Sequence, residues 1–282
     1  MKNLLSDKRA YFAFFGALGG LGSAAFYDFF EPYDHAWASW VSLVGADGLL
    51  TAGLLAIAQG LYAGKGLQAF NVRKTFIFGG IGGIIGGLIA YNLGFPLARL
   101  FGGGEDIGRF LGWTIFGIAV GFAVTKVIPN LRARTACLAG GAGAFLGCSS
   151  MYIFGGGVGV GFYLGVALAS ALIGLVIAQA ENVMRQTWLE VTVRPKGLTL
   201  EKERVLTVTL GDQPVLFGCA GDADVKLAEM VGAKAHFAKV SLSGDKVVWL
   251  DMTTEKSRNL AIDEEIEISN ARVVVRSKVA TA

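Results

Sequence analysis

The sequence predicts an α-helical transmembrane bundle of six helices in three hairpin repeats, followed by an all-β sandwich. Of the 282 residues, 53% are hydrophobic and only 17% are charged, and the mean hydropathy is +0.54. The last 97 residues nevertheless hold 13 of the 25 Lys and Arg and 14 of the 22 Asp and Glu, whereas 35 of the 41 glycines precede them. We therefore predict a transmembrane domain over residues 1–185 and a water-soluble domain over residues 186–282.

Six apolar stretches are long enough to cross a bilayer core of ~30 Å, which takes ~20 helical residues. We expect them at residues 11–30, 42–63, 75–95, 110–128, 135–154 and 158–180. The first stretch has features of a signal peptide. Another apolar run follows it directly, however, so we expect a retained membrane anchor.

The connections between these stretches differ in charge from one side of the membrane to the other. One side carries only Arg99 and Arg109. The other side carries the remaining cations of this region, which are Lys2, Lys8, Arg9, Lys65, Arg73, Lys74, Lys126, Arg132, Arg134 and Arg185. The positive-inside rule then predicts a multi-pass protein of the bacterial inner (cytoplasmic) membrane with both termini in the cytosol.

Glycines repeat along this region. The segment that begins at Arg9 aligns with the one at Arg73 and more weakly with the one at Arg134, which predicts three successive hairpins. Small residues let helices approach closely in lipid. We expect the first, third and fifth helices to pack on one another through glycine faces, with a glycine-lined pore or a homo-oligomer interface as the alternative. These faces hold Gly16, Gly19 and Gly20; Gly79, Gly83 and Gly87; and Gly143 and Gly147.

Asp28 and Asp47 form a possible intramembrane polar site, because an ionisable group at membrane depth is a functional hypothesis by default. Counting back from Ala63 puts Asp47 roughly 24 Å from the cytosolic edge, near the outer rim, where water could reach it. The repeat aligns Leu111 with Asp47, so one chain forms no ring of carboxylates. An ion or proton role and plain solvation both stay open.

The sequence holds no Ser/His/Asp set, HExxH or Walker motif, and the GGGVGVG run at residues 155–161 follows no predicted strand. Cys137, Cys148 and Cys219 show neither zinc spacing nor a disulfide framework. The net charge of +3 leaves no basic footprint for nucleic acid. We therefore predict a protein that is not an enzyme and needs no metal, cofactor or nucleic acid.

After residue 185 the pattern changes to short segments rich in β-branched residues, separated by turn residues. This is typical of an all-β sandwich. Residues 236–243 alternate in polarity, so we expect one buried and one solvated face. The predicted strands are residues 187–193, 204–210, 214–218, 224–227, 235–242, 246–252, 265–268 and 271–277, and one short helix is predicted around residues 228–231.

Three strings, VLFGCAGDADVKL, AKAHFAKVSLSGDKVVWLDM and IDEEIEISNARVVVRS, resemble a forkhead-associated (FHA) domain, which is a phosphothreonine-binding β-sandwich. The resemblance covers residues 189–279. Its landmarks are Gly218, Asp224 to Leu227, His236, Asp251, Ile266 and Ile268.

The resemblance implies a phosphate clamp whose ligands are missing here. Cys219 stands at the arginine position, Ala233 stands at the serine position, and Thr254 and Lys256 lie in the loop that would hold the peptide. A phosphate dianion needs charge-assisted donors, which a thiol and a methyl group do not supply. The resemblance therefore implies a degenerate FHA-like domain in which His236 is a structural histidine; scattered lysines could form a substitute basic patch.

We predict a non-enzymatic membrane scaffold or adaptor. Its FHA-like domain would bind a cytosolic protein or a second copy of the chain without phosphate, through loops or a strand edge, while its helices bind the lipid bilayer. A channel or transporter with a regulatory FHA-like domain is the alternative. A third hypothesis is residual phosphopeptide binding through altered contacts.

Overall fold

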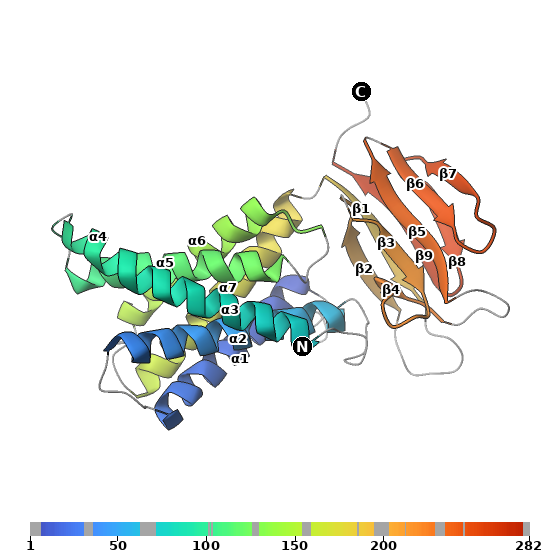
Figure 1. Ribbon diagram of the computed structural model, residues 1–282. Coiled ribbons are helices and arrows are strands. Elements are labelled where there is room, and N and C mark those ends of the chain that lie inside the picture. Colours follow the sequence, from blue (N-terminus) through green and yellow to red (C-terminus); the bar gives the residue numbers. More distant parts are fainter. Residues whose placement is uncertain are drawn as a thin grey trace. The chain divides into compact units, whose positions relative to one another are not determined.

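The computed structural model describes residues 7–30, 36–62, 72–100, 102, 104–125, 130–153, 159–184, 186–194, 203–211, 213–228, 235–244 and 246–278. The chain divides into two compact units, one with the helices and one with the strands (Figure 1). Each unit has its own cluster of buried apolar side chains.

Six helices of the described chain are long and apolar enough to cross a membrane, as expected of a multi-pass membrane protein. All six predicted stretches are confirmed, with ends shifted by a few residues. The helices are α1 (Lys8–Phe30), α2 (Ala36–Tyr62), α3 (Val72–Ile89), α4 (Phe95–Leu100), α5 (Glu105–Val124), α6 (Ala133–Ile153) and α7 (Val160–Met184).

The third span is longer than predicted. After α3 the chain makes a π-helical turn, Ala90–Gly94, and continues into the short helix α4. Pro96 explains the irregular turn, because proline has no N–H to donate and its ring clashes with the preceding helical turn. The π turn lets the span pass this proline, so it ends at Leu100 rather than at residue 95.

Glycines join the helices into a closed ring in the order α1, α2, α3, α5, α6, α7 and back to α1. A methyl group added at Gly16 would lie 2.3 Å from the backbone oxygen of Ser170 on α7. At the other five junctions an added methyl group would lie 2.3–2.9 Å from the facing helix, and these junctions use Gly19 with Thr51, Gly48 with Gly83, Gly86 with Ala119, Gly117 with Gly140, and Gly147 with Ala169. Close backbone approach of this kind is the usual means of helix association in lipid.

The ring corrects one prediction. The predicted glycine faces do pack within the chain, but those of α1, α3 and α6 do not meet one another in the described residues. Gly16 and Gly20 contact α7, Gly79 and Gly83 contact α2, and Gly147 contacts α7. Successive antiparallel spans joined by short connections lie side by side, which puts a second, fourth or sixth span between the odd ones.

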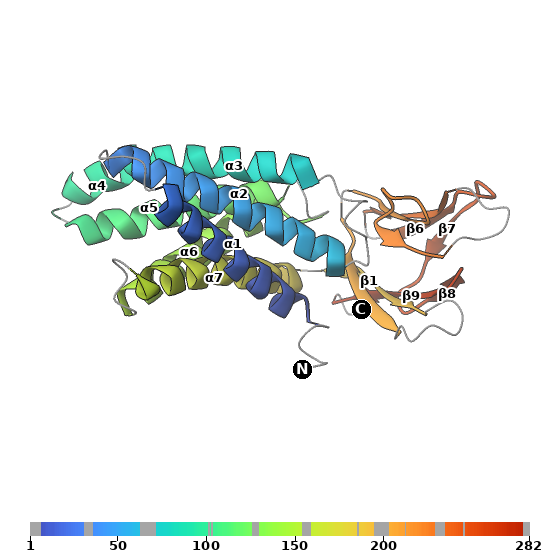
Figure 2. The same ribbon diagram turned by 90° about the horizontal axis from the view of Figure 1, so that it is seen from below.

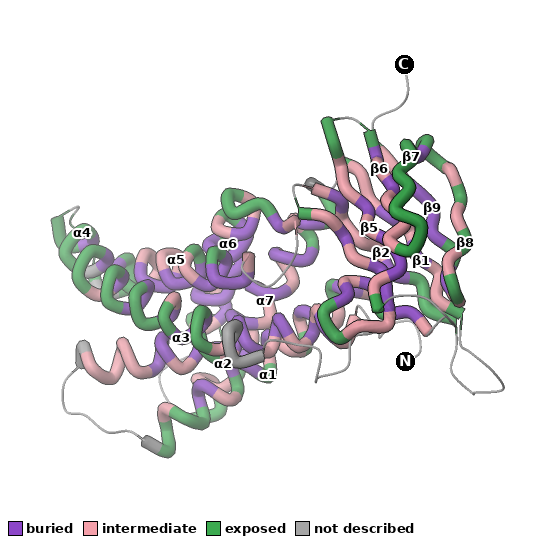
Figure 3. Tube along the Cα trace, turned by 45° about the vertical axis from the view of Figure 1, so that its right-hand side comes forward, coloured by how far each residue is buried: buried purple, intermediate pink, exposed green. Residues whose placement is uncertain are grey.

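Large apolar side chains fill the inside of the ring. Phe12, Leu55, Phe116, Ile173 and Ile177 are fully buried and belong to one cluster. Figure 3 shows buried residues gathered where the helices face one another. Large apolar side chains also point outward, at an exposed fraction of 85% for Phe29 and 79% for Ile153. Lipid, unlike water, imposes no penalty on such a surface.

The strands form two sheets. In the four-stranded sheet the order is β2-β1-β9-β8, and in the five-stranded sheet it is β4-β3-β5-β6-β7. All pairings are antiparallel except that of β3 with β4. The strands are β1 (Thr187–Val193), β2 (Arg204–Thr209), β3 (Val215–Gly218), β4 (Val225–Lys226), β5 (His236–Ser243), β6 (Lys246–Asp251), β7 (Ser257–Leu260), β8 (Glu265–Ile268) and β9 (Ala271–Ser277).

Figure 2 shows the two sheets as two layers, and buried residues of both belong to a single apolar cluster. Phe217 of β3 and Trp249 of β6 have ring centroids 5.8 Å apart in this cluster.

The predicted alternation in β5 holds except at Phe237, which is buried although it lies on the face predicted to be solvated. The register between β3 and β5 shifts at this place, and a bulge re-aims side chains.

The sequence did not predict β7. This strand pairs with β6 at the edge of the five-stranded sheet, and only its last residue, Leu260, is buried. An exposed polar edge strand leaves no apolar alternation in the sequence. The short helix predicted around residues 228–231 lies almost wholly outside the described residues.

Candidate functional site

One end of the five-stranded sheet gathers most positions that the resemblance singles out. At this end β3 stops at Gly218, β5 begins at His236, β6 stops at Asp251 and β7 begins at Ser257. The registers pair Gly218 with His236 and Ala238 with Asp251. The connection after β3, the start of β5 and the connection between β6 and β7 therefore lie next to one another, and we call this region the loop end of the sheet.

Gly218 and Cys219 contact the start of β5. A side chain at Gly218 would collide with the backbone, since an added methyl group would lie 2.3 Å from the oxygen of Ala235. The N–H of Cys219 donates to the same oxygen over 3.0 Å, and its thiol lies 3.6 Å from it. Glycine is thus required for close strand approach, and the thiol contacts the neighbouring chain segment.

His236 binds a carboxylate at the loop end. Its Nε2 lies 2.9 Å from Oδ1 of Asp222, in the connection between β3 and β4. Asp224 in the same connection accepts a hydrogen bond of 3.0 Å from the N–H of Leu216. These two contacts tie the connection to β3 and β5.

The connection between β6 and β7 is organised by Asp251. Its Oδ1 accepts hydrogen bonds from the N–H groups of Thr253, over 2.8 Å, and Thr254, over 3.1 Å. The bond from Thr254, together with that from Thr253, holds the pKa of Asp251 below its ordinary value. Glu255 adopts a left-handed conformation with φ of 58°. The side chains of Thr254 and Lys256 are exposed.

The structure brings Gly218, Cys219 and His236 into direct proximity and puts Thr254 and Lys256 in the adjacent connection. Ala233, and with it Lys234, lies outside the described residues.

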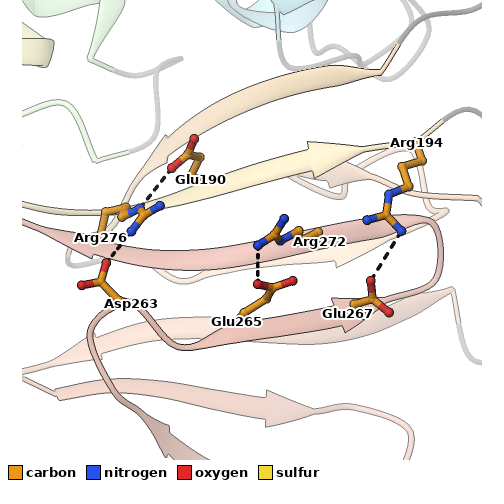
Figure 4. A network of polar contacts seen from close by, with 7 residues as sticks. All are labelled: Glu190, Arg194, Asp263, Glu265, Glu267, Arg272 and Arg276. Atoms are coloured by element: carbon orange, nitrogen blue, oxygen red, sulfur yellow. Dashed lines mark hydrogen bonds and ion pairs between the residues drawn. The ribbon is translucent and has the colours of Figure 1, made fainter.

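Charge at the loop end is mixed rather than basic. Among the described residues, Asp222 and Glu255 stand there beside Lys256, and Lys239 lies further along β5. Three arginines on or beside the four-stranded sheet, Arg194, Arg272 and Arg276, are engaged with carboxylates (Figure 4). Arg276 bridges Glu190 over 3.1 Å and Asp263 over 2.5 Å. The remaining pairs drawn there are Arg272 with Glu265 and Arg194 with Glu267.

The helices hold the second candidate site. Asp28 is exposed on α1 and accepts a hydrogen bond of 2.7 Å from the hydroxyl of Tyr163 on α7. Asp47 on α2 is fully buried, which corrects the prediction that water could reach it. The helix ring explains the difference, because α1 and α7 cover this face of α2. Asp28 and Asp47 therefore do not share one site.

Asp47 accepts hydrogen bonds from three hydroxyl groups. Thr51 of α2 donates over 2.8 Å, Ser23 of α1 over 3.2 Å, and Ser170 of α7 over 2.9 Å to one carboxylate oxygen and 3.1 Å to the other. All four residues are fully buried. Sequence analysis missed the three donors. Thr51 lies one helical turn from Asp47 and could have been found, whereas Ser23 and Ser170 become neighbours only through helix packing.

A buried ion pair was also missed. Nζ of Lys8 on α1 lies 2.6 Å from Oε2 of Glu181 on α7, near the ends of both helices. Lys8 was counted only as a loop cation. Its burial follows from the close approach of α1 and α7 through Gly16 and Gly20.

Among the described residues, no group of three or more His, Cys, Asp or Glu side chains is arranged to hold a metal ion. Comparison with protein-family models, with curated proteins and with solved structures finds no match to this chain.

Proposed function

We propose that this chain is a non-enzymatic scaffold or adaptor of the bacterial inner membrane. Six spans anchor it, both termini lie in the cytosol, and an FHA-like sandwich there binds a protein partner or a second copy of the chain without phosphate. The observation that carries this proposal is the loop end of the five-stranded sheet. It gathers Gly218, Cys219 and His236 beside the connection that contains Thr254 and Lys256.

The composition of the loop end supports binding without phosphate. His236 faces the carboxylate of Asp222, and Glu255 adds a second negative charge in the adjacent connection. Both carboxylates oppose a phosphate dianion. Exposed loops on a rigid sheet remain suited to protein recognition.

The helices support an anchoring role. The interior of the ring is filled by side chains such as Phe12, Phe116 and Ile173, which favours a packed body over a conduit. The cation distribution along the sequence supports cytosolic termini.

A capture experiment with the full chain in detergent tests the proposal. Three baits are compared, which are the wild type, Lys256→Glu at the loop end, and Lys246→Glu at the opposite end of the same sheet. Lys246→Glu is the matched control. Lys256 and Lys246 are both exposed. We expect the wild type and Lys246→Glu to capture the same partner from untreated and phosphatase-treated lysate, and Lys256→Glu to capture much less.

Two results contradict the proposal. Equal capture by both lysine variants would mean that the loop end is not the binding surface. Loss of capture after phosphatase treatment of the lysate would make binding phosphate-dependent. The same conclusion would follow if, in addition to that loss, Cys219→Arg bound a phosphothreonine peptide that the Cys219→Ala control did not bind.

A channel or transporter with a regulatory FHA-like domain is the second candidate, and the buried carboxylate of Asp47 is the observation that favours it. Ion flux through liposomes that contain the wild type or Asp47→Asn separates the two candidates. The anchoring role predicts no flux with either protein, whereas flux that depends on Asp47 supports the transporter.

A further inference from the structure

Five side-chain oxygens from three helices converge inside the ring. They are both carboxylate oxygens of Asp47 and the hydroxyl oxygens of Ser23, Thr51 and Ser170. Each hydroxyl oxygen lies within 3.2 Å of a carboxylate oxygen, and all four residues have an exposed fraction of 0%. We call these four residues the Asp47 cluster.

The ionised carboxylate of Asp47 needs one positive charge nearby to balance it. The three hydroxyl groups that touch Asp47 are neutral, and an ionised carboxylate away from water is costly without a counter-charge. The two basic side chains of α1 are Arg9, which is paired with Asp7, and Lys8, which is paired with Glu181. The nearer one, Arg9, lies fourteen residues before Ser23, roughly 21 Å along the helix. A monovalent cation neutralises one carboxylate, whereas a divalent cation leaves an uncompensated buried charge.

The hydroxyl groups can turn from donors to ligands. The hydroxyl of Ser23 already has a second acceptor, the backbone oxygen of Gly20 at 2.9 Å. When the proton points to that oxygen, the lone pairs of Ser23 face the carboxylate. Serine and threonine in helices commonly donate to a backbone carbonyl one turn earlier, so Thr51 and Ser170 can do the same. Carboxylate and hydroxyl oxygens are the hard ligands that hard cations prefer.

Glycines on α1 let the three helices that carry the cluster lie close together. An added methyl group at Gly19 would lie 2.8 Å from the hydroxyl oxygen of Thr51, and one at Gly20 would lie 2.5 Å from the backbone oxygen of Val166. Glycine at these positions lets α1 approach both α2 and α7 closely enough for their hydroxyl groups to reach one carboxylate. A cage this tight favours a small cation over a large one.

We propose that the Asp47 cluster binds one sodium ion, with Asp47, Ser23, Thr51 and Ser170 as its ligands. The ion joins α1, α2 and α7 at one point within the ring. This binding is independent of partner docking by the β-rich part, so either proposal can fail alone.

Equilibrium binding of ²²Na⁺ to the full chain in detergent tests the site, with N-methylglucamine replacing sodium at constant ionic strength. We expect saturable binding of about one ion per chain, displaced by unlabelled sodium and much less by potassium. Asp47→Asn should abolish binding, and Ser170→Ala should weaken it by about tenfold, the loss of one charge-assisted contact. Asp28→Asn is the matched control and should bind as the wild type does.

Absence of saturable ²²Na⁺ binding to the wild type overturns the proposal without reference to any variant. Binding that persists in Asp47→Asn, or that is lost equally in Asp28→Asn, also overturns it. If Asp47→Asn does not give a monodisperse protein, Ser170→Ala decides. Its affinity must fall, and sodium must raise its Tm less than that of the wild type.

Discussion

Gly117 of α5 and Gly140 of α6 touch through their backbones. A methyl group added at Gly117 would lie 2.3 Å from the oxygen of Gly140, and one added at Gly140 would lie 2.1 Å from the oxygen of Gly117. The contact is reciprocal, so neither helix can accept a side chain at this point without moving away from the other. Gly48 of α2 and Gly83 of α3 form a second reciprocal contact, in which an added methyl group on either glycine would lie 2.5 or 2.9 Å from the Cα of the other.

Gly140→Ala is expected to destabilise the bundle. Overpacking of a tight contact costs roughly 1–3 kcal/mol, and here the obstacle is backbone rather than a flexible side chain. Thermal unfolding of the full chain in detergent measures the effect. Gly104→Ala is the control, because an added methyl group there meets nothing within 4 Å. An unchanged Tm for Gly140→Ala would contradict the close junction of α5 and α6.

The buried pair of Lys8 and Glu181 is expected to show strong coupling. Removal of one partner, as in Lys8→Met or Glu181→Gln, leaves a buried charge and costs about 3–5 kcal/mol. The double variant should recover much of this loss, since no unpaired charge remains. A double-mutant cycle on the free energy of unfolding measures the coupling. Additive losses would mean that the two side chains do not form a buried pair.

Phe217→Ala is expected to destabilise the β-rich part by about 3–5 kcal/mol, because it removes a fully buried ring that contacts Trp249. Urea-dependent proteolysis of the full chain reports the unfolding of this part. Val205→Ala on β2 serves as the control, since the exposed fraction of Val205 is 54% and exposed positions change stability by only about ±0.5 kcal/mol. Equal effects of the two variants would contradict the shared core of the sheets.

Order in the connection between β6 and β7 is expected to depend on pH through Asp251. Its folded-state pKa lies below the ordinary value of 3.8, so its contribution is present above that value and is lost as the pH falls through the folded pKa. Protection of the N–H groups of Thr253 and Thr254 against hydrogen exchange, corrected for intrinsic rates, should fall in this acidic range. Asp251→Ala should lack both the protection and its pH dependence. Protection that is unaffected by the substitution would contradict the two hydrogen bonds.

Properties carried by runs of residues were predictable from the sequence. Six spans follow from apolar length, and eight of the nine strands follow from β-branched segments and turns. The glycine faces were predicted to pack within the chain, and they do, but against neighbouring spans rather than on one another. Each of these features depends on a local pattern that tertiary contacts reinforce.

Features that depend on distant packing were missed. The partners of Asp47 come from both ends of the helical part, so sequence spacing could not reveal that Ser23 and Ser170 surround it. The order of the helix ring is of the same kind. The strand β7 was missed because of its own composition rather than because of distant packing. Arg258 and Asn259 are exposed, so the strand shows no apolar alternation in the sequence.

Protease access to a C-terminal tag in spheroplasts and in inside-out membrane vesicles tests the central claim most directly. A membrane-spanning ring of helices with a cytosolic β-rich part predicts that the tag is removed in inside-out vesicles and retained in intact spheroplasts, while a helical core stays protected in both. Removal of the tag from intact spheroplasts, or complete digestion of the helices in both preparations, would contradict the account.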